Sequence, residues 1–325
     1  MRVLFVTNMW PEEGRHWAGA FVKSQAESLR ERGVTVDVFH VRGYRSQLEY
    51  LRGGMRALRW NAGLDYDVVH AHYGHTGVLA RLQVRRPLVV SYCGDDLLGT
   101  PGADGSFTAK SRAEVAVFRQ LARTVDATIT KSRAMEAVLP PSCRARNQVI
   151  PNGVDTSYFA PQPREAARAE LGWDPAERVV LFAGDPELPR KNFKLAKAAA
   201  ERAANGNGGV HLRVAWNVDR ERMRTMYAAA DALLHTSLIE GSANVLKEAM
   251  AMELPVVAVP AGDAQERLEG VAGCAVCPYE AEPLAEAVAR AVASGRSPQA
   301  REAVSALTAE SVADRVVAVY ESVLP

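Results

Sequence analysis

The stretch HTSLIEGSANVLKEAMAMELPVVAV, residues 235–259, has the clearest structural pattern in the chain. It starts at the end of a predicted strand, continues into a helical segment at 243–252 and ends in a fully apolar strand at 255–259. A strand, a helix and a second strand in this order form a βαβ unit with parallel strands. The stretch therefore predicts an α/β fold built on a parallel sheet.

The same alternation of short apolar runs and longer amphipathic segments extends in both directions from this stretch. It lapses only in PNGVDTSYFAPQP, residues 151–163, which is the best linker candidate. We therefore expect two α/β domains, 1–156 and 157–308, followed by a helical segment at 309–325. The other strands are predicted at 2–7, 34–41, 68–72, 88–92, 127–130, 148–150, 178–183, 210–215, 232–235 and 274–276.

The composition of the 325 residues is that of a globular protein, with 48% hydrophobic and 24% charged residues. Lys and Arg number 39 and Asp and Glu 38, and this near balance argues against general nucleic-acid binding. No run approaches the roughly 18 apolar residues that span a bilayer, and the apolar run at the start is too short for a secretory signal. We therefore expect a cytoplasmic protein.

Three patterns suggest metal binding but lack the partners that a metal site needs. The C-x-x-C at 274–277 has no second pair, and the three histidines within 70–75 have no acidic residue close by in sequence. The D-x-D at 65–67 precedes a predicted strand, so we interpret it as a turn that opens the strand. No metal is expected.

Ligands of open parallel sheets bind outside the carboxyl ends of the strands, and two such sheets facing each other would form a cleft. The loop after the first strand lacks the G-x-G-x-x-G of a nicotinamide-binding domain. In that loop, Gly19 either lets a phosphate approach the next helix or is a plain loop glycine. Other first-half candidates in strand-end loops are Arg15, His16, His72, Asp95 and Asp96.

His72 is expected to line the cleft, while another histidine of the group packs in the core. Asp95 and Asp96 follow a strand and are candidates on the acceptor side, with capping of the next turn as their competing use. The segment 44–60 carries four arginines among Leu, Met and Trp residues. It is either a packed helix with a solvated basic face or a helix that contacts an anionic membrane.

In the second half, Arg190 and Lys191 stand just before a helix, where the helix dipole disfavours cations. This placement favours contact with a bound diphosphate over a solvated surface. Glu240 and Glu248 lie eight residues apart, about 12 Å along one helix, so they suit the two ends of a long ligand. Residues 241–244 between them are not acidic, which leaves the N–H groups of the helix start for phosphate. An ordinary βαβ unit with two surface glutamates is the alternative.

These pieces resemble a known family. The segment from Glu240 to Ala251, followed by Leu-Pro-Val-Val-Ala, is similar to the Glu-x7-Glu segment of the retaining GT-B glycosyltransferases of family 4, or glycosyl transferases group 1. HAHYG at 70–74, PNGVD at 151–155 and RKN at 190–192 are similar to other landmarks of that family and occur in the same order.

The resemblance implies two Rossmann-like domains facing across a cleft, with the last helix crossing back to the N-terminal domain. It implies that Glu248 binds the donor ribose, that Glu240 contacts the sugar and that Lys191 and Arg190 neutralise the diphosphate. It places His72 beside the transferred sugar. The donor-binding residues would be Gly19, Gly241, Ser242, Ala243, Asn244, Val245 and Glu248. The chain has Asp185 where the family has an arginine, and Arg190 is the candidate replacement.

The expected function is retaining, metal-independent transfer of a hexose-type sugar from a UDP- or GDP-linked donor. No cofactor is expected. The acceptor is expected to be a glycan, a lipid-linked molecule or a small molecule, and the resemblance suggests bacterial cell-envelope polysaccharide synthesis. A UDP-sugar epimerase-like GT-B enzyme and a nucleotide-sugar-binding protein without turnover are the alternatives.

Overall fold

The computed structural model divides the chain into two compact units. It describes residues 1–15, 18–43, 46, 48–50, 52–53, 55, 65–102, 106–205 and 209–325. The first unit consists of Met1–Thr100, Phe107–Gly153 and Ala309–Pro325, and the second unit consists of Pro101–Ser106 and Val154–Thr308. Each unit contains one sheet in which every strand pair is parallel. The predicted α/β class is therefore confirmed.

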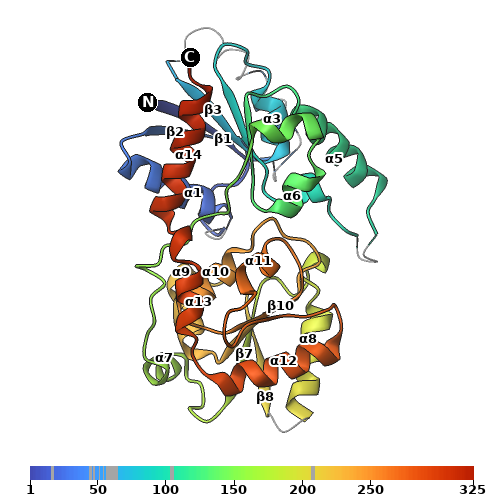
Figure 1. Cartoon of the computed structure of the whole chain (residues 1–325), viewed down its shortest axis with the longest axis vertical. Helices are drawn as coiled ribbons and strands as arrows, with labels where there is room; N and C mark the ends of the chain where they lie inside the picture. Colours follow the sequence, from blue (N-terminus) through green and yellow to red (C-terminus); the bar gives the residue numbers. More distant parts are fainter. Residues whose placement is uncertain are drawn as a thin grey trace. The chain divides into compact units, whose positions relative to one another are not determined.

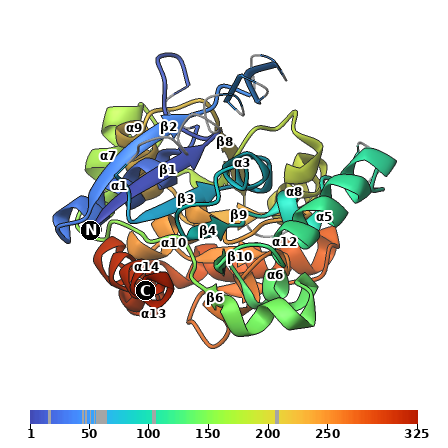
Figure 2. The ribbon, with the colours of Figure 1, turned by 90° about the horizontal axis from the view of Figure 1, so that it is seen from above.

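The sheet of the first unit has six strands in the order β2-β1-β3-β4-β5-β6, and Figure 2 shows β2, β1, β3 and β4 side by side. Its strands are rich in Val and other β-branched residues and are largely buried, as expected of a parallel sheet covered on both faces. They are β1 (Arg2–Thr7), β2 (Thr35–His40), β3 (Val68–His72), β4 (Leu88–Ser91), β5 (Ala127–Thr130) and β6 (Asn147–Val149).

Helices cover both faces of this sheet. One face packs against α1 (Ala20–Glu31) and α14 (Ala309–Val323), which lie side by side in Figure 1. An ion pair between Arg32 and Asp314 joins the two. The last helix thus returns to the first unit, as the resemblance implied. The other face packs against α3 (Gly74–Ala80), α4 (Asp95–Leu98), α5 (Ala109–Leu121) and α6 (Arg133–Val138), and the 3₁₀ helix η1 (Pro141–Arg146) precedes β6.

The sheet of the second unit has five strands in the order β11-β10-β9-β7-β8. They are β7 (Arg178–Ala183), β8 (Val210–Ala215), β9 (Ala232–His235), β10 (Val256–Ala258) and β11 (Ala275–Val276). One face carries α7 (Arg164–Leu171), α9 (Arg220–Ala229), α10 (Asn244–Ala251), α11 (Ala264–Leu268) and α13 (Pro298–Ala303). The other carries α8 (Phe193–Ala203) and α12 (Ala281–Ser294), and the short 3₁₀ helices are η2 (Pro189–Lys191) and η4 (Ser305–Leu307).

Every predicted strand is present, with ends that differ from the prediction by at most two residues. The D-x-D segment also lies where it was expected, just before β3. There the carboxylate of Asp67 accepts the backbone N–H of Arg2 at 2.7 Å, which ties β3 to the start of β1. In the part of the chain that the structure describes, no helix has the length and apolar character to cross a membrane.

Candidate active site

The strongest candidate site lies in the second unit, where two loops follow neighbouring strands. Because β7 and β9 are paired, the loops that leave their carboxyl ends run next to each other. The N–H of Leu238 donates to the carbonyl oxygen of Arg190 at 2.8 Å. The hydroxyl of Thr236 lies 3.1 Å from the carbonyl oxygens of both Lys191 and Asn192. These bonds fix the two loops to each other without using the charged side chains.

Glu240 brings together the cations that the sequence predicted. Its Oε1 lies 2.5 Å from Nζ of Lys191 and 3.3 Å from Nη1 of Arg190. One carboxylate therefore serves two cations, and the cluster of three side chains keeps a net positive charge. Nε2 of His235 lies 3.6 Å from the same oxygen, beyond hydrogen-bond distance.

The protonation states of this cluster follow from burial and charge. Burial opposes ionisation of Glu240, but Lys191, His235 and Arg190 outweigh it, so the pKa of Glu240 lies well below its ordinary value. Burial lowers the pKa of His235, and the attraction of Glu240 only partly offsets this. At neutral pH the site therefore holds an ionised glutamate, two cations and a neutral imidazole.

The backbone beside this cluster leaves room for the Lys191 side chain. A Cβ atom at Gly184 would lie 3.3 Å from Cδ of Lys191, so the lysine stem passes close over the end of β7. Asp185, which stands where the family that the sequence resembles has an arginine, accepts the N–H of Glu187 at 3.0 Å and stabilises the turn. The cation that lies beside Glu240 is Arg190, from farther along the same loop.

Helix α10 begins next to this cluster. No side chain caps its N-terminus at Ala243, and its first turn holds no acidic residue. The predicted donor-binding residues Gly241, Ser242 and Ala243 are buried and lead directly into the helix. The positive end of the α10 dipole therefore adds to the charge of Lys191 and Arg190.

A buried chain of hydrogen bonds holds Ser242, and sequence reasoning missed it. Lys247, only 1% exposed, donates from Nζ to Oγ of Ser242 at 2.7 Å, and that hydroxyl lies 2.8 Å from Oδ2 of Asp263. The backbone of Gly262 presses against the same loop, since a Cβ there would lie 3.0 Å from the carbonyl oxygen of Gly241. A lysine among the apolar residues of a predicted helix was the available signal.

Glu248 lies in the second turn of α10 and is partly buried. Its Oε2 accepts a hydrogen bond from the hydroxyl of Tyr227 on α9 at 2.9 Å. Burial raises the pKa of Glu248, and the bond from Tyr227 limits the rise. Tyr227, fully buried, is a second supporting residue that sequence reasoning missed.

The first unit buries His72 at the end of β3. Its side chain is fully buried beneath α1, and its place beside the transferred sugar stays a prediction. Its ring packs against Phe5 and His70, and Nε2 lies 2.8 Å from Oε1 of Gln25. His70 packs in the core as predicted, bonded to Tyr320 and to Ser91. Nδ1 of His72 is buried and has no hydrogen-bond partner in the described residues.

Asp96 acts as a cap in the first unit. Its carboxylate accepts backbone N–H groups from Gly74, Cys93, Gly94 and Leu97, at 2.9 to 3.1 Å. The competing use that the sequence left open is therefore correct for Asp96. Burial, together with the charge of Asp95, raises its pKa to about 7. Asp95 is more open and accepts a hydrogen bond from Thr100 at 3.2 Å.

Gly19 has a structural reason to be glycine. It has φ +73° at the start of α1, and a Cβ there would lie 2.2 Å from the carbonyl carbon of Met9. The plain loop reading thus explains this residue without a phosphate. Arg15 ends a short turn that pairs it with Glu12. His16 and most of the basic segment 44–60 lie outside the described residues.

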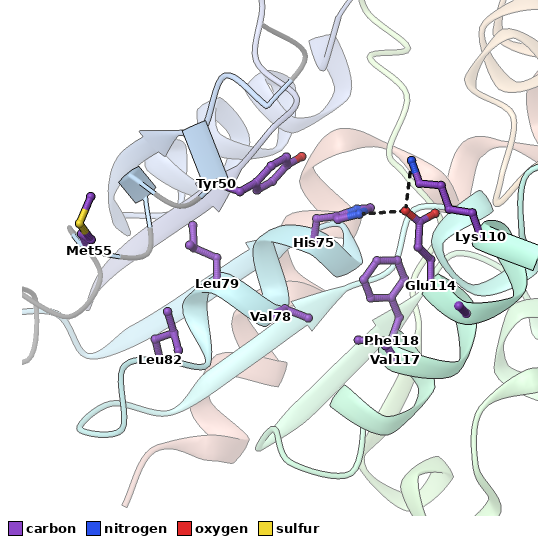
Figure 3. A pocket seen from close by; sticks show the side chains of 11 residues that line it. Tyr50, Met55, His75, Val78, Leu79, Leu82, Lys110, Glu114, Val117 and Phe118 are labelled. Atoms are coloured by element: carbon purple, nitrogen blue, oxygen red, sulfur yellow. Dashed lines mark ion pairs between the residues drawn. The ribbon is translucent and has the colours of Figure 1, made fainter. Parts of the chain in front are cut away.

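The first unit also contains an apolar pocket of about 600 Å³ between α3 and α5, shown in Figure 3. Leu79, Leu82, Val117 and Phe118 supply much of its lining. Its charged groups are paired: Glu114 lies 3.5 Å from Nε2 of His75 and 3.8 Å from Nζ of Lys110. The pocket would accommodate an apolar group, and none of the predicted site residues lines it.

Comparison with family models gives one match for each half of the chain. The model described as "Glycosyltransferase Family 4" matches residues 21–158. The model described as "Glycosyl transferases group 1" matches residues 166–294.

Comparison with curated proteins finds relatives in Nocardia, Mycolicibacterium and Mycobacterium. A D-inositol 3-phosphate glycosyltransferase of Nocardia farcinica is 29% identical, covering 69% of this chain and 58% of the relative. The enzyme of the same name from Mycolicibacterium gilvum is 30% identical, covering 78% and 65%. A GDP-mannose-dependent alpha-mannosyltransferase of Mycobacterium tuberculosis is 30% identical, covering 64% and 58%. The chain thus spans 58% to 65% of the length of these relatives.

Solved structures share the fold over nearly the whole chain. Sucrose-phosphate synthase from Thermosynechococcus elongatus has a TM-score of 0.80 at 18% identity, covering 99% of this chain and 98% of that one. Anabaena HepE in complex with UDP and glucose has a TM-score of 0.72 at 19% identity, covering 99% and 100%.

Proposed function

The chain belongs to the family 4 glycosyltransferases and has the GT-B fold, and from this premise we propose that it transfers a hexose-type sugar from a nucleotide-diphosphate donor to an acceptor hydroxyl. The observation that carries the proposal is the cluster of Glu240 with Lys191 and Arg190 beside the start of α10. It is a preformed positive site at the carboxyl ends of two parallel strands, where such folds bind ligands.

The two ends of the donor would bind to different carboxylates. The ribose hydroxyls donate to Glu248, whose carboxylate Tyr227 holds in position from below. The diphosphate lies against Lys191, Arg190 and the N–H groups at 241–245. Glu240 then contacts the sugar while it continues to hold both cations. The pattern of donor names among similar proteins, GDP-mannose for one and UDP for another, supports a UDP- or GDP-linked donor.

The chemistry that this cluster serves is departure of the nucleoside diphosphate. Cleavage of the glycosidic bond leaves positive charge on the sugar and negative charge on the leaving phosphate. Lys191, Arg190 and the positive end of the α10 dipole would face that negative charge, and Glu240 keeps the cations in place before the donor arrives. Such preorganised electrostatic stabilisation is commonly the largest contribution to catalysis.

We propose that the reaction proceeds with retention and without a metal ion. The leaving oxygen would help to remove the proton of the acceptor hydroxyl on the same face of the sugar. An NMR spectrum of the first product reports its anomeric configuration directly. Activity that survives EDTA supports the metal-independent mechanism, and activity lost to EDTA and restored by Mg²⁺ or Mn²⁺ contradicts it.

The acceptor is proposed to be a glycan, a lipid-linked molecule or a small molecule, in cell-envelope synthesis. The apolar pocket of the first unit supports an acceptor with an apolar part. We also propose peripheral contact with the anionic inner face of the plasma membrane through the basic segment 44–60. Vesicle sedimentation with and without anionic lipid tests this contact, which should vanish at high salt.

The experiment that tests the function is nucleoside diphosphate release from a panel of UDP-, GDP- and ADP-hexoses. The proposal expects release from one donor type, strongly increased by an acceptor extract. A sugar nucleotide that changes configuration without any acceptor indicates the epimerase-like alternative. Tight donor binding without release under single-turnover conditions indicates a binding protein without turnover.

A further inference from the structure

The carboxyl end of β9 holds a buried histidine to which the proposed reaction gives no role. His235 is the last residue of this strand and is only 4% exposed. Side chains two residues apart on a strand share a face, so its ring lies on the same face as Leu233, which packs with residues of α10 and α11. Its register partner on β10 is Ala258, which carries no charge. Polar groups buried in this way normally have hydrogen-bond partners.

Neither ring nitrogen of His235 has a hydrogen-bond partner among the described residues. Nε2 lies 3.6 Å from Oε1 of Glu240, just beyond hydrogen-bond distance. Burial lowers the pKa of His235, so the ring is neutral at neutral pH. A neutral imidazole carries one ring proton, and the nearby carboxylate favours that proton on Nε2. The ring therefore presents to Glu240 a donor that is not yet used in a hydrogen bond.

The carboxylate of Glu240 contacts the protein through one of its oxygens. Nζ of Lys191, Nη1 of Arg190 and Nε2 of His235 all approach Oε1. In the part of the chain that the structure describes, these side-chain contacts leave Oε2 for a sugar hydroxyl. A diphosphate that binds to Lys191 and Arg190 would compete with Oε1 for their N–H groups. Glu240 then needs a further donor on Oε1 if its carboxylate is to keep one orientation.

We propose that His235 is a positioning residue for sugar recognition. Its Nε2–H donates to Oε1 of Glu240 when the diphosphate binds, and so keeps Oε2 directed at a hydroxyl of the transferred hexose. No proton changes its owner, and the distance from Nε2 to Oε1 shortens. This role rests on the proposed function, because the diphosphate and the hexose belong to the donor. The position of the ring proton does not, and it can be measured in the free protein.

The first test locates the ring proton by NMR of the ring nitrogens, in the free protein at neutral pH. His235→Gln identifies the signals of His235 among those of the seven histidines. A neutral ring with its proton on Nε2 is expected, and Glu240→Gln should shift its signals. His211 near the start of β8, 3.4 Å from Glu177, is the matched control and should not respond. A proton on Nδ1, or signals of His235 that Glu240→Gln leaves unchanged, would overturn the proposal.

The second test compares the kcat of three variants with UDP-glucose or GDP-mannose, whichever reacts. The amide nitrogen of His235→Gln lies about as far along the side chain as Nε2, whereas that of His235→Asn corresponds to Nδ1. His235→Gln should therefore keep kcat within about threefold, and His235→Asn and His235→Leu should lower it about tenfold or more. His211→Leu should leave kcat unchanged. Equal kcat values for His235→Gln and His235→Asn would contradict the proposal.

Binding of UDP and GDP, which lack the sugar, distinguishes positioning from a structural role. Backbone bonds fix the loop after β9 to Arg190 and Lys191, so a distorted loop would also weaken binding of the diphosphate. The Kd of the nucleoside diphosphate, measured by calorimetry, should therefore stay within about twofold in His235→Leu while kcat falls. A loss of affinity that parallels the loss of kcat would mean that His235 only supports the loop.

The same measurements separate this inference from the proposed function. If wild type binds neither UDP nor GDP and no donor reacts, the proposed function fails, and the role of His235 in sugar recognition fails with it. A ring proton on Nε2 that responds to Glu240→Gln would still establish the contact between the two side chains. If donors react and His235→Leu keeps the wild-type kcat, the proposed function stands and the positioning role is wrong.

Discussion

The carboxyl edges of the two sheets differ in how their charged side chains are paired. In the second unit, Lys191 and Arg190 are partly exposed and share the charge of Glu240. In the first unit, Asp96 is buried and its carboxylate accepts backbone N–H groups of the protein itself. The first arrangement is preorganised and leaves one positive charge for a ligand, whereas the hydrogen bonds of the second are already satisfied within the unit. Preorganised charge is typical of a group that stabilises a transition state, and a buried carboxylate with several backbone partners is typical of a structural cap.

The largest effect is expected for Lys191, on the preorganised side of this comparison. Lys191→Met should lower kcat about a hundredfold or more, because one stabilising donor at a developing charge contributes about 3 kcal/mol. Steady-state release of nucleoside diphosphate measures it. Lys194→Met, an exposed lysine in the first turn of α8, is the matched control. Near-wild-type turnover of Lys191→Met would remove the cluster from the mechanism.

A smaller effect, on binding, is expected for Glu248. Glu248→Gln should raise KM for the donor by about 10- to 100-fold with little change in kcat, since hydrogen bonds to a charged group contribute about 1.5–3 kcal/mol. The loss should be equal for all sugars on the same nucleotide, because the carboxylate meets the ribose. An unchanged donor KM would exclude Glu248 from the donor site. Tyr227→Phe leaves the carboxylate of Glu248 in place and should raise the donor KM by a smaller factor.

The next prediction concerns Lys247, whose hydrogen bond to Ser242 holds the loop before α10. Lys247→Met leaves Ser242 bonded only to Asp263, and kcat should fall about tenfold, a loss of roughly 1.4 kcal/mol. A double-mutant cycle with Ser242→Ala checks the cause. If Lys247 acts through Ser242, the two losses will not add. Additive losses would show that Lys247 acts by another route.

The smallest effect on activity is expected for Asp96, the residue that the structure reassigns as a cap. Asp96→Asn should change kcat/KM less than about threefold, or roughly 0.6 kcal/mol. Asp96 should instead affect how the free energy of unfolding depends on pH. The folded-state pKa of Asp96 is raised to about 7, so its contribution is present below the unfolded pKa and is lost as the pH rises to about 7.

Urea unfolding of both proteins between pH 4 and pH 8 checks this sign. Over that range, wild type should lose stability relative to Asp96→Asn. A gain of wild type over the variant with rising pH would mean that the carboxylate is stabilised in its ionised form, contrary to its burial.

The sequence predicted the two sheets well because their signal is local. Buried runs such as 2–7 and 178–183 are apolar whichever elements cover them, and the strands follow. The cluster of Arg190, Lys191 and Glu240 was also predictable, because each residue follows a strand end and such ends lie side by side in a parallel sheet.

Other features depend on which helix packs against which face, and the sequence alone does not determine this. His72 was expected to line a cleft because it ends a strand, and its contact with Gln25 of α1 could not be predicted. The bonds from Lys247 to Ser242 and on to Asp263 join two loops that are separated along the chain.

The central claim is that the second unit holds a sugar nucleotide by its two ends, and a crystal structure with bound UDP or GDP tests it most directly. The account predicts ribose hydroxyls within hydrogen-bond distance of Glu248, and a diphosphate against Lys191, Arg190 and the start of α10. A nucleotide bound elsewhere, with Glu248 still paired only to Tyr227, would contradict it.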